Sequence, residues 1–142
     1  MNLLENTQLY RTYGAHPAGQ GWTFRVYAPN ARDAALAGDF NGWQPAPMQR
    51  QGGDWVLAVP DAQPGQCYKY VITGADGQVR WKADPYGTYA QLRPDTASRL
   101  YDVSGFRWHD DVWRERRRET PLTDGPLNIY EVHPGSWRRD ED

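Results

Sequence analysis

The side chains best suited to binding chemistry in this sequence are aromatic residues set beside polar ones. Trp43 follows Phe40-Asn41-Gly42, a stretch with the composition of a turn, where a large apolar side chain has little reason to be buried. A sugar ring has an apolar C–H face that stacks on an aromatic plane, and its hydroxyl groups require hydrogen bonds from polar neighbours. Trp43 is therefore a candidate for sugar stacking. The alternative is a tryptophan that folds back onto the core.

For two further candidates, a binding role depends on which face of a strand the side chain occupies. Lys69 lies between two tyrosines, on the opposite face of a predicted strand, where a solvated lysine is the ordinary alternative to a binding residue. Trp81 lies on the next predicted strand. A two-residue turn at Asp76-Gly77 would pair Trp81 with Ile72 and turn it toward the core, whereas a bulge of one residue would place it on the face of Lys69. The sequence leaves both orientations open.

The sequence lacks the common motifs of catalysis and cofactor binding. It has no glycine-rich phosphate loop, no serine elbow and no dinucleotide fingerprint. Its single cysteine, Cys67, cannot form an intramolecular disulfide and has no local base, so we expect an inert buried thiol. Glu131 and His133 would share a strand face, but two ligands do not make a metal site. We therefore expect no catalytic residue, no metal and no cofactor.

Charge and hydropathy restrict the partners. Among the 142 residues, 16 are basic and 18 are acidic, a balance that argues against a nucleic-acid-binding domain. No apolar run approaches the roughly 18 residues of a membrane helix. The N-terminus also lacks the basic start and apolar stretch of a secretion signal. We expect a cytoplasmic protein with neither nucleic-acid nor membrane partners.

The elements that must position these candidates are strands and turns. Aromatic residues make up 13% of the chain, with 14 glycines and 11 prolines, a composition that favours an all-β fold. Alternation of period two predicts strands at residues 22–27, 34–40, 55–59, 68–73 and 79–83, with weaker strands at 86–92 and 99–103. Turn residues separate them at the spacing of a sandwich. We therefore predict one antiparallel β-sandwich over residues 21–106, with at most one substantial helix inside it.

The segment before the predicted sandwich reads as an N-terminal extension. It covers residues 1–20, where Gly14, Pro17 and Gly19 are expected to break any regular element.

The segment after the sandwich changes in character. Asp110 and Asp111 are good helix starters, so a short helix is predicted at Val112–Glu119, within a helix-and-linker region of residues 107–126. Leu127–Val132 has the pattern of a strand with no obvious partner. Residues 127–142 are therefore expected to be the incomplete start of a second domain.

Short motifs occur in order along nearly the whole chain and carry a family resemblance. They are Phe24-Arg25-Val26-Tyr27-Ala28-Pro29-Asn30-Ala31, Gly38-Asp39-Phe40-Asn41-Gly42-Trp43, Tyr68-Lys69-Tyr70, Gly74-Ala75-Asp76-Gly77, Lys82-Ala83-Asp84-Pro85-Tyr86, Leu92-Arg93-Pro94 and Thr96-Ala97-Ser98. Together they resemble the N-terminal carbohydrate-binding module of bacterial glycogen branching enzymes. Ile129-Tyr130-Glu131-Val132-His133 with Gly135-Ser136-Trp137 resembles the first strand of their α-amylase-type (β/α)8 catalytic barrel.

The resemblance implies an immunoglobulin-like sandwich whose partners are α-1,4-glucan or glycogen and the catalytic barrel of a parent enzyme. It places the sugar-binding triad of related modules on Trp43, Lys69 and Trp81. The parent would be a 1,4-alpha-glucan branching enzyme, a glycosyltransferase of glycogen biosynthesis. Its retaining chemistry needs two carboxyl groups about 5 Å apart, which the family carries on later barrel strands, so this chain alone is expected to be inactive.

One alternative stays open from the sequence. In this alternative, the chain is a structural domain that packs on the barrel and has no sugar site of its own. In either case an unpaired strand near the C-terminus could recruit a second copy of the chain, so self-association through this tail is a further expectation.

Overall fold

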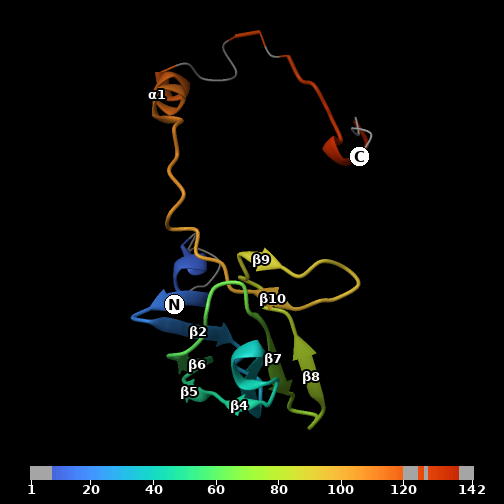
Figure 1. Cartoon of the computed structure of the whole chain (residues 1–142). Helices are drawn as coiled ribbons and strands as arrows, with labels where there is room; N and C mark the ends of the chain where they lie inside the picture. The colour runs from blue at the N-terminus through green and yellow to red at the C-terminus, as the bar shows by residue number, and fades with distance from the viewer. Residues whose placement is uncertain (1–7, 120–124, 127, 138–142) are drawn as a thin grey trace. The chain divides into compact units, whose positions relative to one another are not determined.

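The computed structural model describes residues 8–119, 125–126 and 128–137, and the chain divides into two compact units, residues 1–105 and 106–142. The first unit holds two antiparallel sheets (Figure 1). In one sheet the strand order is β1 (Gly14–Ala18), β2 (Gly21–Tyr27), β6 (Asp54–Val59) and β5 (Gln49–Gln51). In the other the order is β4 (Ala46–Pro47), β3 (Asp33–Gly38), β7 (Cys67–Thr73), β10 (Ser98–Arg99) and β9 (Tyr89–Ala90), and β8 (Val79–Lys82) pairs with β7.

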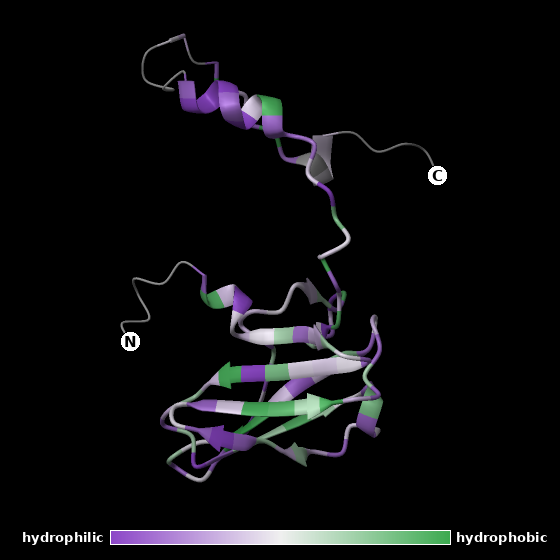
Figure 2. Ribbon diagram, turned by 90° about the vertical axis from the view of Figure 1, so that its left-hand side faces the viewer, coloured by the Kyte–Doolittle hydropathy of each residue, from purple (hydrophilic) through white to green (hydrophobic). Residues whose placement is uncertain are grey.

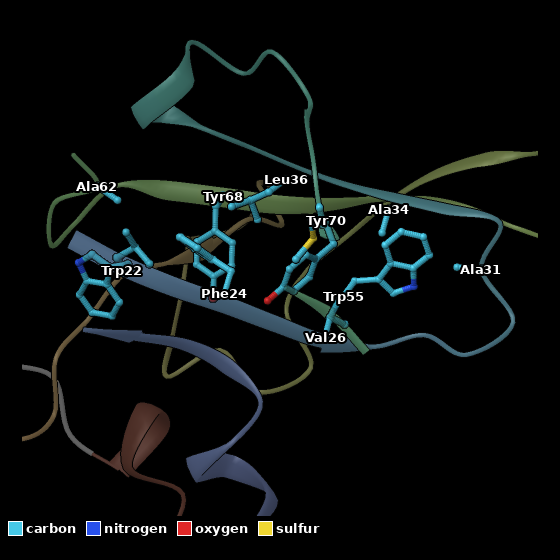
Figure 3. Packing of buried hydrophobic residues seen from close by; sticks show 12 residues of the cluster. Trp22, Phe24, Val26, Ala31, Ala34, Leu36, Trp55, Ala62, Tyr68 and Tyr70 are labelled. Carbon is cyan, nitrogen blue, oxygen red and sulfur yellow. The ribbon is translucent and has the colours of Figure 1, made fainter. Parts of the chain in front are cut away.

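The predicted all-β antiparallel sandwich is confirmed. The five strands with the strongest alternation, β2, β3, β6, β7 and β8, lie where period two predicts them. Inward side chains of β2, β3, β6 and β7 form most of one aromatic-rich core between the sheets (Figure 3). Trp22 and Trp55 belong to this core, as their alternation with aliphatic residues predicts. Between residues 21 and 103 the only helical element is the three-residue 3-10 turn η3 (Asp39–Asn41).

Strand β1 contradicts the interpretation of its segment as irregular. Gly14 to Ala18 pair in register with Arg25 to Gly21 of β2, within the segment expected to be an extension. The segment tolerates Pro17 because β1 is the edge of its sheet, so the missing N–H can point away from the ladder. Gly19 has φ 63° and supplies the turn into β2 rather than ending the element. The sandwich therefore begins before Gly21.

A buried carboxylate ties the strands of the second sheet together. Asp84, just after β8, accepts hydrogen bonds on Oδ2 from the hydroxyls of Tyr68 (2.6 Å) and Tyr70 (3.3 Å), and on Oδ1 from the N–H of Tyr86 (2.8 Å). Its own N–H donates to Oγ of Ser98 on β10 at 2.8 Å. Burial is the main cause that raises the pKa of Asp84 and of both tyrosines.

The second unit contains the predicted helix. α1 spans Asp111–Glu119 and begins where the N–H of Arg114 donates to the carbonyl of Asp110 at 2.9 Å. Most of its length is hydrophilic (Figure 2).

The strand predicted at Leu127–Val132 is wrong for the residues that can be assessed. Residues 128–132 carry no strand, while Leu127 and much of the linker, residues 120–124, lie outside the described part. A strand of a parallel barrel takes its hydrogen bonds from neighbouring strands, and the described part of this unit offers none. Instead, α2 (Pro134–Trp137) follows, and proline is well suited to the first turn of a helix.

Candidate functional site

The turn between β3 and β4 places Trp43 on the surface. Asn41 fastens the turn to the end of β3, because its side-chain oxygen accepts the N–H of Gly38 (2.9 Å) and its side-chain nitrogen donates to the carbonyl of Leu36 (3.1 Å). Gly42 then takes left-handed backbone angles, with φ 60° and ψ 30°. Trp43 is also left-handed, with φ 61°, and its N–H donates to the carbonyl of Gly38 at 2.9 Å. These bonds fix the backbone from which the indole projects.

The indole ring of Trp43 is held by a carboxylate. Its Nε1–H donates to Oδ1 of Asp39 at 2.9 Å, and Oδ2 of Asp39 accepts the backbone N–H of Cys67 at 2.7 Å. Cys67 is the first residue of β7 and is buried, as expected. One carboxylate therefore joins the Trp43 turn to the strand that carries Lys69.

Strand β7 divides its residues between the two faces of the sheet. Tyr68 and Tyr70 are almost fully buried in the core, so Lys69 between them points to the outer face. Lys69 is half-buried there, and its Nζ donates to Oγ1 of Thr96 at 2.7 Å. Its cross-strand neighbour on β3 is Ala37, a small residue that is fully covered.

The β7–β8 hairpin settles the orientation of Trp81. The N–H of Gly74 donates to the carbonyl of Gln78 at 3.0 Å, which leaves a three-residue loop that ends in Gly77 with φ 76°. Trp81 consequently pairs with Val71, two residues from Lys69, and shares its outer face. A two-residue turn, which would have paired Trp81 with Ile72, is absent from this hairpin.

Asp76 stabilises the hairpin loop. Its carboxylate accepts hydrogen bonds from Arg80 at 2.6 and 3.1 Å and from the N–H of Gln78 at 3.0 Å. The hydrogen bonds from Arg80 are the main cause that lowers the pKa of Asp76 to about 2.

The structure brings the predicted residues together on one surface. The ring centroids of Trp43 and Trp81 lie 6.4 Å apart with planes inclined by 34°. Trp81 is 46% exposed, and Trp43 is half-buried. Lys69 adds a cation and hydrogen-bond donor to the same face. Two indoles beside a donor are suited to stacking on the C–H faces of sugar rings while their hydroxyls are hydrogen-bonded.

Two polar members of this surface were not assigned a role from the sequence. Asp39 is four residues before Trp43 in the motif Gly38-Asp39-Phe40-Asn41-Gly42-Trp43, and that short spacing is the signal that could have identified it. Thr96 is 27 residues from Lys69, and no local pattern predicts their contact.

The first unit also has a groove of about 470 Å³. It is lined by Tyr10, Arg11, Ala15, His16, Pro17, Thr88 and residues 101–104. It shares no residue with the Trp43, Lys69 and Trp81 surface.

None of the helices in the described part of the chain has the length and apolar character needed to cross a membrane.

Comparison with known families places the sandwich among carbohydrate-binding modules. The profile of carbohydrate-binding module 48 (isoamylase N-terminal domain) matches residues 12–87. The 1,4-alpha-glucan branching enzymes GlgB of Rubrobacter xylanophilus and Butyrivibrio fibrisolvens are 46% and 43% identical to this sequence over 96% and 94% of the chain. The chain spans only 20% and 22% of the lengths of these two curated relatives.

Solved structures share the same architecture. Klebsiella pneumoniae pullulanase complexed with maltotriose superimposes with a TM-score of 0.56 at 26% identity, covering 63% of this chain and 9% of that one. A putative alpha amylase from Salmonella typhimurium gives a TM-score of 0.56 at 24% identity, covering 72% of this chain and 17% of that one, a likeness of fold alone.

Proposed function

The chain belongs to the carbohydrate-binding module 48 family, and from this premise we propose that it binds α-1,4-glucan through Trp43, Lys69 and Trp81. The observation that carries the proposal is the approach of the Trp43 and Trp81 rings to 6.4 Å on the outer face that Lys69 shares. Each indole offers a plane for one glucose ring, and Lys69 offers a donor to the hydroxyls. The surface contains no pair of carboxylates, so binding rather than bond cleavage is the chemistry it supports.

The role of the module within a longer protein follows from its relatives. We infer from the family match that the chain contains the binding module of such a protein, of which it spans about a fifth. We infer that the module holds glycogen near a catalytic barrel that forms α-1,6 branches, and that the protein acts in glycogen biosynthesis in the cytoplasm. Nucleic acids and membranes are not among its proposed partners. Association of two copies through the C-terminal segment stays a prediction.

Calorimetric titration of the chain with maltoheptaose tests the proposed site. Trp43→Ala and Trp81→Ala should each weaken binding by about fivefold or more, since one aromatic stack is worth on the order of 1–3 kcal/mol. Trp108→Ala is the matched control, because Trp108 is 72% exposed and lies outside the site. Wild-type affinity in both site variants, or equal loss in the control, would refute the assignment.

One observation favours a second role for the module. Tyr10, Tyr101 and Val103 are each 54% exposed around the 470 Å³ groove, which has no residue in common with the proposed sugar site. Exposed apolar side chains around a groove mark surfaces that other proteins cover. We propose that the surface around this groove packs against the catalytic barrel of the parent protein. Glucan binding and packing would then use separate surfaces of one module.

A further inference from the structure

The orientation of Trp43 depends on an unusual set of constraints. Its φ of 61° lies in the left-handed region, which is costly for a residue with a bulky side chain and persists only where surrounding contacts enforce it. The hydrogen bond from its N–H to Gly38 fixes the backbone but leaves the ring free to turn about χ2, whose energy profile is broad. A second contact is needed to fix the plane of the indole.

Asp39 supplies that contact and is placed to do more. Its Oδ1 accepts Nε1–H of Trp43 at 2.9 Å, and its Oδ2 accepts the N–H of Cys67 at 2.7 Å. Bonds to an ionised carboxylate are stronger than bonds between neutral groups. The indole N–H lies in the plane of the ring, so its bond to Asp39 covers neither face on which a sugar would stack.

We propose that Asp39 is the positioning residue of the sugar site: it holds the indole of Trp43 at its angle to Trp81 and ties it to the strand that carries Lys69. This inference rests on the proposed glucan-binding function. A ring that is already held in place loses little freedom when a sugar stacks on it, so Asp39 raises affinity without touching the ligand.

A double-mutant cycle separates positioning from general structural support. Asp39→Ala is measured alone and in a Trp43→Phe background, where an aromatic ring remains but the Nε1–H donor is gone. Asp39→Ala should weaken maltoheptaose binding about tenfold in the wild-type background and less than twofold beside Trp43→Phe. An equal loss in both backgrounds would show that Asp39 acts only through Cys67, and would overturn the proposal.

Asp33→Ala is the matched control. Asp33 begins β3 of the same sheet, is exposed, and accepts the backbone N–H of Ala34 rather than an indole. The affinity of the Asp33→Ala variant for maltoheptaose should stay within twofold of the wild-type value. A loss as large as that of Asp39→Ala would overturn the specific role of Asp39.

A measurement without glucan keeps the two proposals distinct. Two nearby indoles give paired circular-dichroism bands of opposite sign. The bands of the Trp43 and Trp81 pair are those that disappear in the Trp81→Phe variant. Asp39→Ala should reduce this signal by at least half. If Asp39→Ala fails to fold, Asp39→Asn replaces it; this variant keeps one oxygen acceptor and should still reduce the signal measurably. An unchanged signal in the folded variant overturns positioning, whatever the glucan titration gives. Failure of the wild-type chain to bind maltoheptaose would instead refute the proposed function, while the optical signal would still decide the role of Asp39.

Discussion

At the scale of single residues, Trp43 shows how recognition and stability can oppose each other. The turn places it at φ 61°, where glycine would be the least strained residue. A tryptophan at this position is therefore explained by the half-buried ring that it presents at the surface and not by the needs of the backbone. An observed backbone outlier of this kind supports a functional role for the side chain.

Glycine usually makes a protein less stable than alanine at the same position, and we expect the opposite order at Trp43. Both changes remove the ring, its contact with Trp81 and its bond to Asp39, so these losses cancel in the comparison. Trp43→Gly should be more stable than Trp43→Ala by about 1 kcal/mol, because only alanine keeps the left-handed strain. Urea unfolding of the two variants measures the difference.

Ala46→Gly provides the reference for this comparison. Ala46 lies in the short strand β4, where glycine should be the less stable residue by the usual roughly 0.5–1 kcal/mol. If Trp43→Gly proves less stable than Trp43→Ala by a similar amount, the turn is not strained at Trp43.

At the scale of elements, one face of β7 packs in the core and the other presents Lys69 at the surface. Tyr68 and Tyr70 point inward and donate to Asp84, while Lys69 points outward to the proposed sugar site. The inward hydroxyls hold their protons strongly, since burial and the nearby carboxylate raise the pKa of both tyrosines above 10.

Stability should therefore fall steeply above pH 10. There the unfolded chain releases its tyrosine protons while the folded chain retains those of Tyr68 and Tyr70, so rising pH favours unfolding. Each retained proton contributes a slope of about 1.4 kcal/mol per pH unit, or about 2.7 for the pair. Below pH 10 the stabilisation is fully present. Urea unfolding between pH 9 and 11 measures the slope.

Tyr68→Phe should lower that slope by about 1.4 kcal/mol per pH unit, because one retained proton is gone. Tyr101→Phe serves as the exposed control. A slope that does not change in Tyr68→Phe would mean that the hydroxyl of Tyr68 ionises alike in both states.

Elements also show where sequence reasoning succeeds and where it stops. Strands such as β2 and β7 follow from alternation, because one face of each must be buried in the core. β1 was missed because proline and glycine are excluded from central strands but not from an edge. The face of Trp81 was undecided because it depends on a single residue of hairpin loop length. The partner of Lys69, Thr96, depends on tertiary structure alone.

At the scale of the whole molecule, the described hydrophobic core belongs to the first unit. In the part of the chain that the structure describes, the buried hydrophobic residues run from Tyr13 to Leu100, within the unit that ends at residue 105. The three proposed sugar-binding residues lie within it as well. The helix α1 in the second unit buries no residue.

The chain shortened to residues 1–105 should therefore fold and bind as the full chain does. Its thermal midpoint should stay within about 2 °C and its affinity for maltoheptaose within twofold, since no core or site residue is removed. Calorimetry on both lengths measures this. Loss of cooperative unfolding in the shortened chain would mean that residues 106–142 belong to the sandwich.

The inclination of the two tryptophan rings has a consequence for the shape of any ligand. Planes that meet at 34° cannot both lie flat on a straight ribbon. A chain that stacks one unit on Trp43 and another on Trp81 must curve between them, as α-1,4-linked glucose does when it coils. A chain that runs straight, such as β-1,4-linked glucose, meets one ring at a time. At the proposed site, we therefore expect the angle between two side chains to select polymers by their curvature, although both kinds of chain are built from the same sugar.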